Sequence, residues 1–126
     1  MTAGLACFPR IAPIDAYGNG GFRFAGMSHK GSLLCLPSGI FEWAGVGSIG
    51  DVSLQKLQKV LDDRQRVGLL LLGTGPELKR PSLDVRQAFV AASVGLEIMD
   101  TGAACRTFNV LLAEGRAIAA ALIAVA

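Results

Sequence analysis

The feature that most constrains the fold is the apolar run from Val67 to Leu72, which contains no polar side chain. Six residues are the length of a β-strand, and a strand without polar alternation is buried on both faces. A Gly-Thr-Gly sequence follows at residues 73–75 and marks the end of that strand. The run therefore predicts an inner strand that is covered by a layer of structure on each side.

Strands and helices alternate after residue 52. Helices are predicted to begin at the N-cap residues Ser53, Ser82 and Thr101, and the last two end near Gly95 and Gly115. Further strands are predicted at 96–99 and 116–125. Strands that alternate with helices are joined by right-handed crossovers and lie parallel.

The first third of the chain has a different pattern, with short alternating runs between glycine-rich turns. We expect strands at 11–16, 21–25, 32–36 and 40–43, and we expect them to join the same sheet as antiparallel members. The predicted fold is α/β: a layered single domain over residues 1–126, with an ordered core at about 11–123. Its central sheet is mixed, with antiparallel N-terminal strands that are followed by β-α units.

The composition is more apolar than a small domain needs for its core. Hydrophobic residues make up 52% of the chain and charged residues 17%, below the usual quarter, and the mean hydropathy is +0.48. Two interpretations remain open: an apolar surface for self-association or a partner, or a deeply buried sheet with many alanines.

Charge and cysteine content argue against several classes of protein. The net charge of +2 comes from 12 basic and 10 acidic residues without a basic run, which argues against nucleic-acid binding. Cys7, Cys35 and Cys105 are odd in number and far apart, which argues against a disulfide framework or a zinc site and favours a reducing, cytoplasmic compartment. We expect no cofactor and no metal.

Membrane insertion and secretion are not expected. The longest apolar run, residues 117–126, has half of the about twenty residues that a membrane-spanning helix needs. The N-terminus shows no basic segment followed by an apolar core, so no secretory signal is predicted.

Candidate chemistry lies at two strand-to-helix junctions. Gly73, Thr74 and Gly75 form the first, where glycines bring backbone N–H groups close to a bound anion. Pro76 removes one donor there, and a tight turn at the strand end is the favoured interpretation.

The second junction carries Asp100 and Thr101, followed on the helix by Cys105, Arg106 and Asn109. If the two strands are neighbours, both junctions lie at the carboxyl edge of the sheet, where open α/β folds bind ligands. Each residue also has a structural interpretation: Thr101 as the helix cap, Asp100 as a favourable charge at the helix start, and Cys105 as a half-buried inert thiol.

No catalytic residue is predicted, because a nucleophilic cysteine needs a base. The sole histidine, His29, is expected at a hairpin tip or on the surface of the antiparallel part.

Several of these residues match a known family over about residues 11–123. The chain resembles the small-domain family that includes mitochondrial complex I assembly factor 3 and the adipogenesis-associated protein of vertebrates, with uncharacterised bacterial members. Phe108 stands where tyrosine is more usual in that family. The matching positions are Tyr17-Gly18, Gly21-Phe22, Trp43, Gly73-Thr74-Gly75, Gly95, Met99-Asp100-Thr101, Ala104-Cys105-Arg106-Thr107, Asn109, Leu111 and Arg116.

The resemblance implies a three-layer α/β fold with a mixed sheet and no established catalytic activity. It also implies, for the mitochondrial relatives, a role in assembling a respiratory membrane complex through protein contacts. The first hypothesis is thus a non-enzymatic binding or assembly-factor-like protein, with respiratory-complex subunits or assembly factors as partners and a possible homo-oligomeric state. The alternative is a protein, with or without enzyme activity, that binds a small anionic ligand between residues 73–75 and Arg106. A third hypothesis assigns all these residues to fold maintenance.

Overall fold

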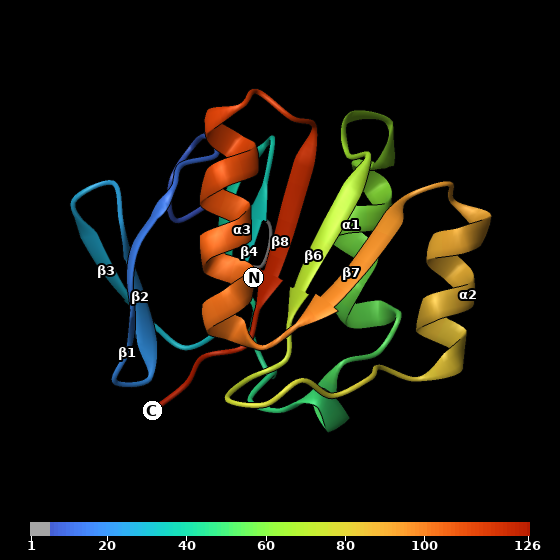
Figure 1. The fold of residues 1–126 in the computed structure, drawn as a ribbon, viewed down its shortest axis with the longest axis horizontal. Coiled ribbons are helices and arrows are strands. Elements are labelled where there is room, and N and C mark those ends of the chain that lie inside the picture. Colours follow the sequence, from blue (N-terminus) through green and yellow to red (C-terminus); the bar gives the residue numbers. More distant parts are fainter. Residues whose placement is uncertain (1–5) are drawn as a thin grey trace.

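The computed structural model describes residues 6–126, which form two sheets and the helices that pack on them (Figure 1). The larger sheet has five strands in the order β5-β4-β8-β6-β7, and the smaller has three in the order β1-β2-β3. The larger sheet contains β4 (Leu33–Leu36), β5 (Gly39–Glu42), β6 (Leu69–Gly73), β7 (Gly95–Met99) and β8 (Ile118–Leu122). The smaller contains β1 (Ile14–Gly18), β2 (Gly21–Phe24) and β3 (Met27–Lys30).

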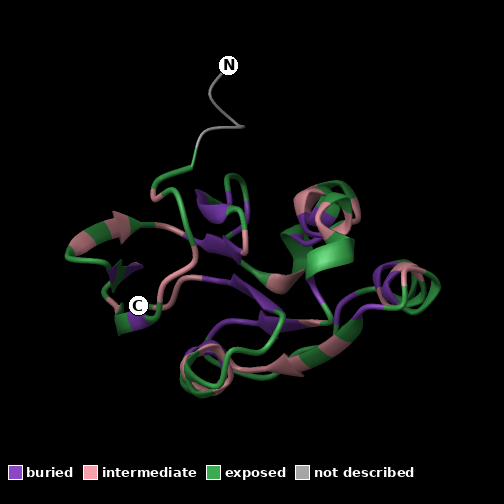
Figure 2. Cartoon of the chain, turned by 90° about the horizontal axis from the view of Figure 1, so that it is seen from above, coloured by how far each residue is buried: buried purple, intermediate pink, exposed green. Residues whose placement is uncertain are grey.

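Helices cover both faces of the five-stranded sheet, as Figure 2 shows from above. The helix α3 (Thr101–Ala113) packs on one face, and α1 (Gln58–Asp62) and α2 (Leu83–Ala91) pack on the other. The remaining helical turns are the 3-10 segments η1 (Ile49–Asp51), η2 (Gln55–Leu57) and η3 (Arg64–Arg66). The layered α/β fold with a mixed sheet, predicted from the alternation, is confirmed.

The strand predicted from the apolar run is β6, and it has partners on both sides. It pairs in parallel with both β7 and β8, while β8 pairs antiparallel with β4. Leu70 and Leu72 belong to the core under α1 and α2, whereas Leu71 belongs to the core under α3. This alternation of buried residues between the two faces is why the run contains no polar side chain.

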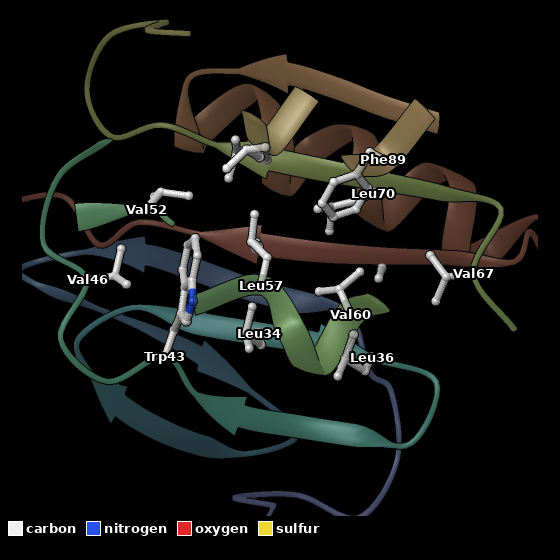
Figure 3. Close-up of a cluster of buried hydrophobic side chains, with 14 of the residues drawn as sticks. Leu34, Leu36, Trp43, Val46, Val52, Leu57, Val60, Val67, Leu70 and Phe89 are labelled. Carbon is white, nitrogen blue, oxygen red and sulfur yellow. The ribbon is translucent and has the colours of Figure 1, made fainter. Parts of the chain in front are cut away.

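The core between the sheet and α1 includes Trp43, which lies on the same side of the cluster as Leu34, Leu57 and Val52 (Figure 3). The indole Nε1 donates a hydrogen bond to the carbonyl oxygen of Lys56 at 2.7 Å. A buried indole needs such an acceptor, since an unpaired buried donor costs about 1–3 kcal/mol.

One prediction about the antiparallel part is wrong. The strands β1 and β2 do not join the main sheet but form the small sheet beside α3, and only β4 and β5 extend the larger one.

The residues expected as a hairpin tip form β3, in which His29 pairs with Phe22. His29 is half-buried, and its Nε2 has no hydrogen-bond partner among residues 6–126. One face of β3 is exposed, so its sequence lacks the apolar alternation that marks a strand.

The helix predicted after Ser53 is also interrupted. It is divided into the 3-10 turn η2 and the five-residue α1, and each of these segments buries one apolar side chain, Leu57 and Val60.

Candidate functional site

The structure divides the eight predicted site residues into two groups. Gly73, Thr74, Gly75, Asp100 and Thr101 lie together where β6 and β7 end, because these strands are parallel neighbours. Cys105, Arg106 and Asn109 lie further along α3. The condition stated from the sequence, that the two strands are neighbours, is met, so both junctions lie at one edge of the sheet.

Hydrogen bonds within the protein connect the first group. The Thr101 hydroxyl donates to the carbonyl oxygen of Ile123 at 2.6 Å and accepts from the N–H of Gly75 at 2.9 Å. The Thr101 N–H donates to the carbonyl oxygen of Gly75 at 2.9 Å, and the Thr74 N–H donates to that of Met99, also at 2.9 Å. The ends of β6, β7 and β8 are therefore linked through one buried side chain.

The same bonds bear on anion binding at this junction. The N–H groups of Thr74 and Gly75, the donors that an anion would need, already have protein acceptors. The Thr74 hydroxyl donates to the carbonyl oxygen of Glu77 and accepts from the N–H of Lys79. Binding of an anionic ligand here stays a prediction, and the exposed guanidinium of Arg106 is the cation that it invokes.

The cap of α3 differs from the prediction. Asp100, not Thr101, is the N-cap: its Oδ1 accepts from the N–H of Ala103 at 2.9 Å. Thr101 is the first helical residue, and its side chain points into the protein with no exposed surface. A carboxylate at this position also interacts favourably with the positive end of the helix dipole.

Asn109 joins α3 to the small sheet. Its Nδ2 donates to the carbonyl oxygen of Ile14, and its Oδ1 accepts from the N–H of the same residue, both at 2.8 Å. The carboxamide thereby pairs with the edge of β1 as a neighbouring strand would. Asn109 therefore has a structural function, as the third hypothesis expects, although the sequence did not identify Ile14 as its partner.

Arg106 and Tyr17 lie on the outside of the contact between α3 and β1. The Nη1 of Arg106 is 3.4 Å from the Tyr17 hydroxyl oxygen. The tyrosine covers Gly102, where a Cβ would overlap its hydroxyl. Tyr17 remains 42% exposed, so the pair presents an aromatic ring and a cation to solvent.

The thiol of Cys105 is more buried than the half-buried position expected for it. It is 3% exposed, and burial raises its pKa to about 12, although the Arg106 cation opposes the shift. Burial, and to a lesser extent Cys105, also raises the pKa of Cys35. Because a thiolate is the reactive form of cysteine, both thiols are inert at neutral pH.

A groove that the sequence did not predict lies on the small sheet. It has a volume of about 500 Å³, is lined by residues 16–19, 21–23 and 28–30, and includes none of the eight predicted residues. The sequence Phe22-Arg23-Phe24 could have indicated this groove. The two phenylalanines belong to the core, so Arg23 between them points to the other face of the strand.

Two further observations concern the part of the chain that the structure describes. Among residues 6–126, no three His, Cys, Asp or Glu side chains are placed to hold a metal ion together. No helix in that range is both long and apolar enough to span a bilayer.

Comparison with known proteins identifies relatives along nearly the whole chain. The family model described as "Protein of unknown function (DUF498/DUF598)" matches residues 14–123. NADH dehydrogenase [ubiquinone] 1 alpha subcomplex assembly factor 3 of Mus musculus is 34% identical over 116 residues, which are 92% of this chain and 62% of the mouse protein. An uncharacterized protein of Rhodobacter capsulatus is 36% identical, over 92% of this chain and 87% of its own length.

Solved structures share the fold. A crystal structure from Bartonella henselae, described as an outer membrane protein, has a TM-score of 0.89 and 50% identity, covering 94% of this chain and 99% of that one. A solution structure from Rhodopseudomonas palustris has a TM-score of 0.82 and 43% identity, covering 97% and 89%. A Bordetella pertussis structure described as a Mth938-like domain has a TM-score of 0.78 and 26% identity, covering 90% and 85%.

The chain thus spans about three fifths of the mouse assembly factor, and the family resemblance predicted from the sequence is confirmed. This chain belongs to the DUF498/DUF598 family, whose relatives include the complex I assembly factor 3 proteins.

Proposed function

We propose that this protein is a non-enzymatic assembly factor that aids the formation of a respiratory complex through contacts with other proteins. The observation that carries the proposal is the 34% identity to an assembly factor of NADH dehydrogenase, over 92% of this chain.

The chemistry of the described residues supports a binding function. The two buried thiols are inert, and the polar groups at the strand-end junction bond to one another. Large apolar side chains remain on the surface at Leu78, Leu83, Val90 and Val110, with Val90 79% exposed. Exposed apolar groups are typical of surfaces that contact other proteins.

We further propose that the protein acts in the cytoplasm as a single domain, with proteins rather than nucleic acids as partners, and that it can self-associate. The even mixture of 12 basic and 10 acidic residues supports the choice of protein over nucleic acid.

Deletion of the gene in its own organism tests the proposed function. We expect less assembled NADH dehydrogenase on native gels, with the other respiratory complexes unchanged as internal controls. A tagged copy should restore the complex and should capture its subunits or assembly factors. Normal amounts of the assembled complex in the deletion strain, together with recovery of the bait alone, would show that the proposal is wrong.

A further inference from the structure

We propose that the groove on the small sheet binds an acidic segment of a protein partner. We call this surface the basic groove and define it by Arg23, Ser28 and Lys30 above Ala16 and Gly18. The inference rests on the proposed function in one respect, since it assumes that the partner is a protein.

Strand register places these residues on one face. Arg23 pairs with Ala16 on one side and with Ser28 on the other, and Gly21 likewise pairs with Gly18 and Lys30. Cross-strand partners point to the same face of a sheet, and so do residues two apart along one strand. The neighbouring row contains Phe22, which is buried in the core under α3, so the basic groove lies on the opposite, outward face.

The floor of the basic groove is backbone with little side chain above it. Gly18 and Ala16 carry at most a methyl group, and a Cβ at Gly21 would overlap the carbonyl oxygen of His29. The close approach of β2 and β3 therefore requires glycine at position 21. Because this floor has almost no side chains, an extended peptide can lie close to the sheet, and the side chains of the peptide can fit between those of Arg23, Ser28 and Lys30.

The charge of the basic groove determines the chemistry of its ligand. Its lining includes the cations of Arg23 and Lys30 but no carboxylate. Within residues 6–126 the one salt bridge joins Arg66 and Asp63, so no carboxylate lies within 4.0 Å of either cation. Both side chains are exposed and available, and the fork of an arginine fits a carboxylate with two hydrogen bonds.

The other anionic partners fit less well. Nucleic-acid surfaces combine many cations with exposed aromatic rings, whereas the basic groove has two cations, and the one exposed ring among its lining residues, that of Tyr17, lies against Gly102 of α3 in the row that contains Phe22. A membrane-binding surface needs large apolar side chains beside its cations, and the outward rows of this sheet hold alanine, glycine and serine instead. Carboxylates on an extended protein segment match both the charge and the shape.

A labelled hexaglutamate peptide is a direct probe. In low salt, fluorescence anisotropy should show saturable binding to the whole chain, and the double variant Arg23→Glu/Lys30→Glu should weaken it at least tenfold. The matched control is Lys79→Glu/Arg80→Glu, which changes the net charge equally in the exposed loop between β6 and α2. We expect the control to change binding by less than threefold, with unchanged circular dichroism for both variants.

Three results would overturn the inference. One is the absence of saturable binding, and another is equal weakening by the two double variants, which would indicate non-specific attraction. The third is tighter, Arg23-dependent binding of inorganic phosphate or of phosphatidylserine vesicles, which would make the groove a phosphate or membrane site.

Capture from cells separates this inference from the proposed function. If the wild-type chain captures NADH dehydrogenase subunits and Arg23→Glu/Lys30→Glu captures them equally well, the inference fails and the function stands. If the wild-type chain captures none while the peptide binds in the groove, the function fails and the acidic-segment site stands.

Discussion

The hydroxyl of Thr101 makes two hydrogen bonds where it has no access to water, to the N–H of Gly75 and the carbonyl oxygen of Ile123. A buried group that loses its partner costs about 1–3 kcal/mol, because it was desolvated on folding and gains nothing in return. Single residues of this kind determine the geometry at the ends of β6, β7 and β8.

The variant Thr101→Val tests this role. Valine has nearly the same shape but no hydroxyl, so we expect it to lower the free energy of unfolding by about 3 kcal/mol, because two buried groups lose their partner. Thr101→Ser is the control, since it keeps the hydroxyl and loses one methyl, at a cost of about 1 kcal/mol. Urea unfolding measures both, and equal stabilities of the two variants would contradict the assigned role.

Thr101 also shows how far residue-level prediction extends. The sequence correctly predicted that a helix begins here, but it could not distinguish between two adjacent residues that both carry a side-chain oxygen. Asp100 is the N-cap, and Thr101 is turned toward the interior. The choice depends on Gly75 and Ile123, which are distant in sequence and approach only in the folded chain.

Among the elements, α3 has two separate contacts. Ala104 and Phe108 belong to the core between α3 and the five-stranded sheet, while Asn109 bonds to β1. The small sheet is thus held to the rest of the molecule partly by a single carboxamide.

Asn109→Ala should loosen that attachment. The N–H and carbonyl of Ile14 lose their partner, and we expect a loss of about 2 kcal/mol in the free energy of unfolding. Hydrogen exchange should show faster exchange in β1, β2 and β3, with β6 and β8 less affected. Val110→Ala is the matched control, because Val110 is the next residue on the same helix and is 57% exposed. Equal exchange rates in the two variants would contradict this assignment.

The elements themselves were predicted more accurately than their arrangement. Hydrophobic periodicity indicates which face of a strand is buried, but it does not indicate which sheet the strand joins. The assignment of β1 and β2 to a separate sheet depends on contacts with α3, which the pattern of the strands does not contain. The basic groove was missed for the same reason, since it exists only when three strands are in register.

The whole molecule has a core on each side of its main sheet, and the core under α3 contains two thiols, Cys35 and Cys105. Burial raises the pKa of Cys105 from its ordinary value of 9.0 to about 12 and raises that of Cys35 as well. Below pH 9 both thiols are protonated in the folded and the unfolded chain alike. Above it the unfolded chain ionises first, so stability is lost as the pH rises from about 9 toward 12.

Replacing a buried thiol should reduce this alkaline sensitivity. For each thiol that ionises only in the unfolded chain, the free energy of unfolding falls by up to about 1.4 kcal/mol per pH unit. Cys105→Ala should therefore lose less stability than the wild-type chain between pH 8 and pH 10, measured by urea unfolding with a reductant present. Cys7→Ala is the control, because Cys7 is exposed and its replacement removes no buried thiol. If the free energy of unfolding of Cys105→Ala falls with pH as steeply as that of the wild-type chain, burial of this thiol does not cause the loss of stability at alkaline pH.

The position of β8 has a consequence for biosynthesis. This strand lies between β4 and β6 and comes after all the other strands along the chain (Figure 1). While a ribosome is still translating the chain, β4 and β6 have emerged but lack the strand that joins them, and each exposes an open hydrogen-bonding edge. The two halves of the main sheet can unite only after residues 118–122 have left the exit tunnel, so the nascent chain is most prone to aggregate before β8 takes its place.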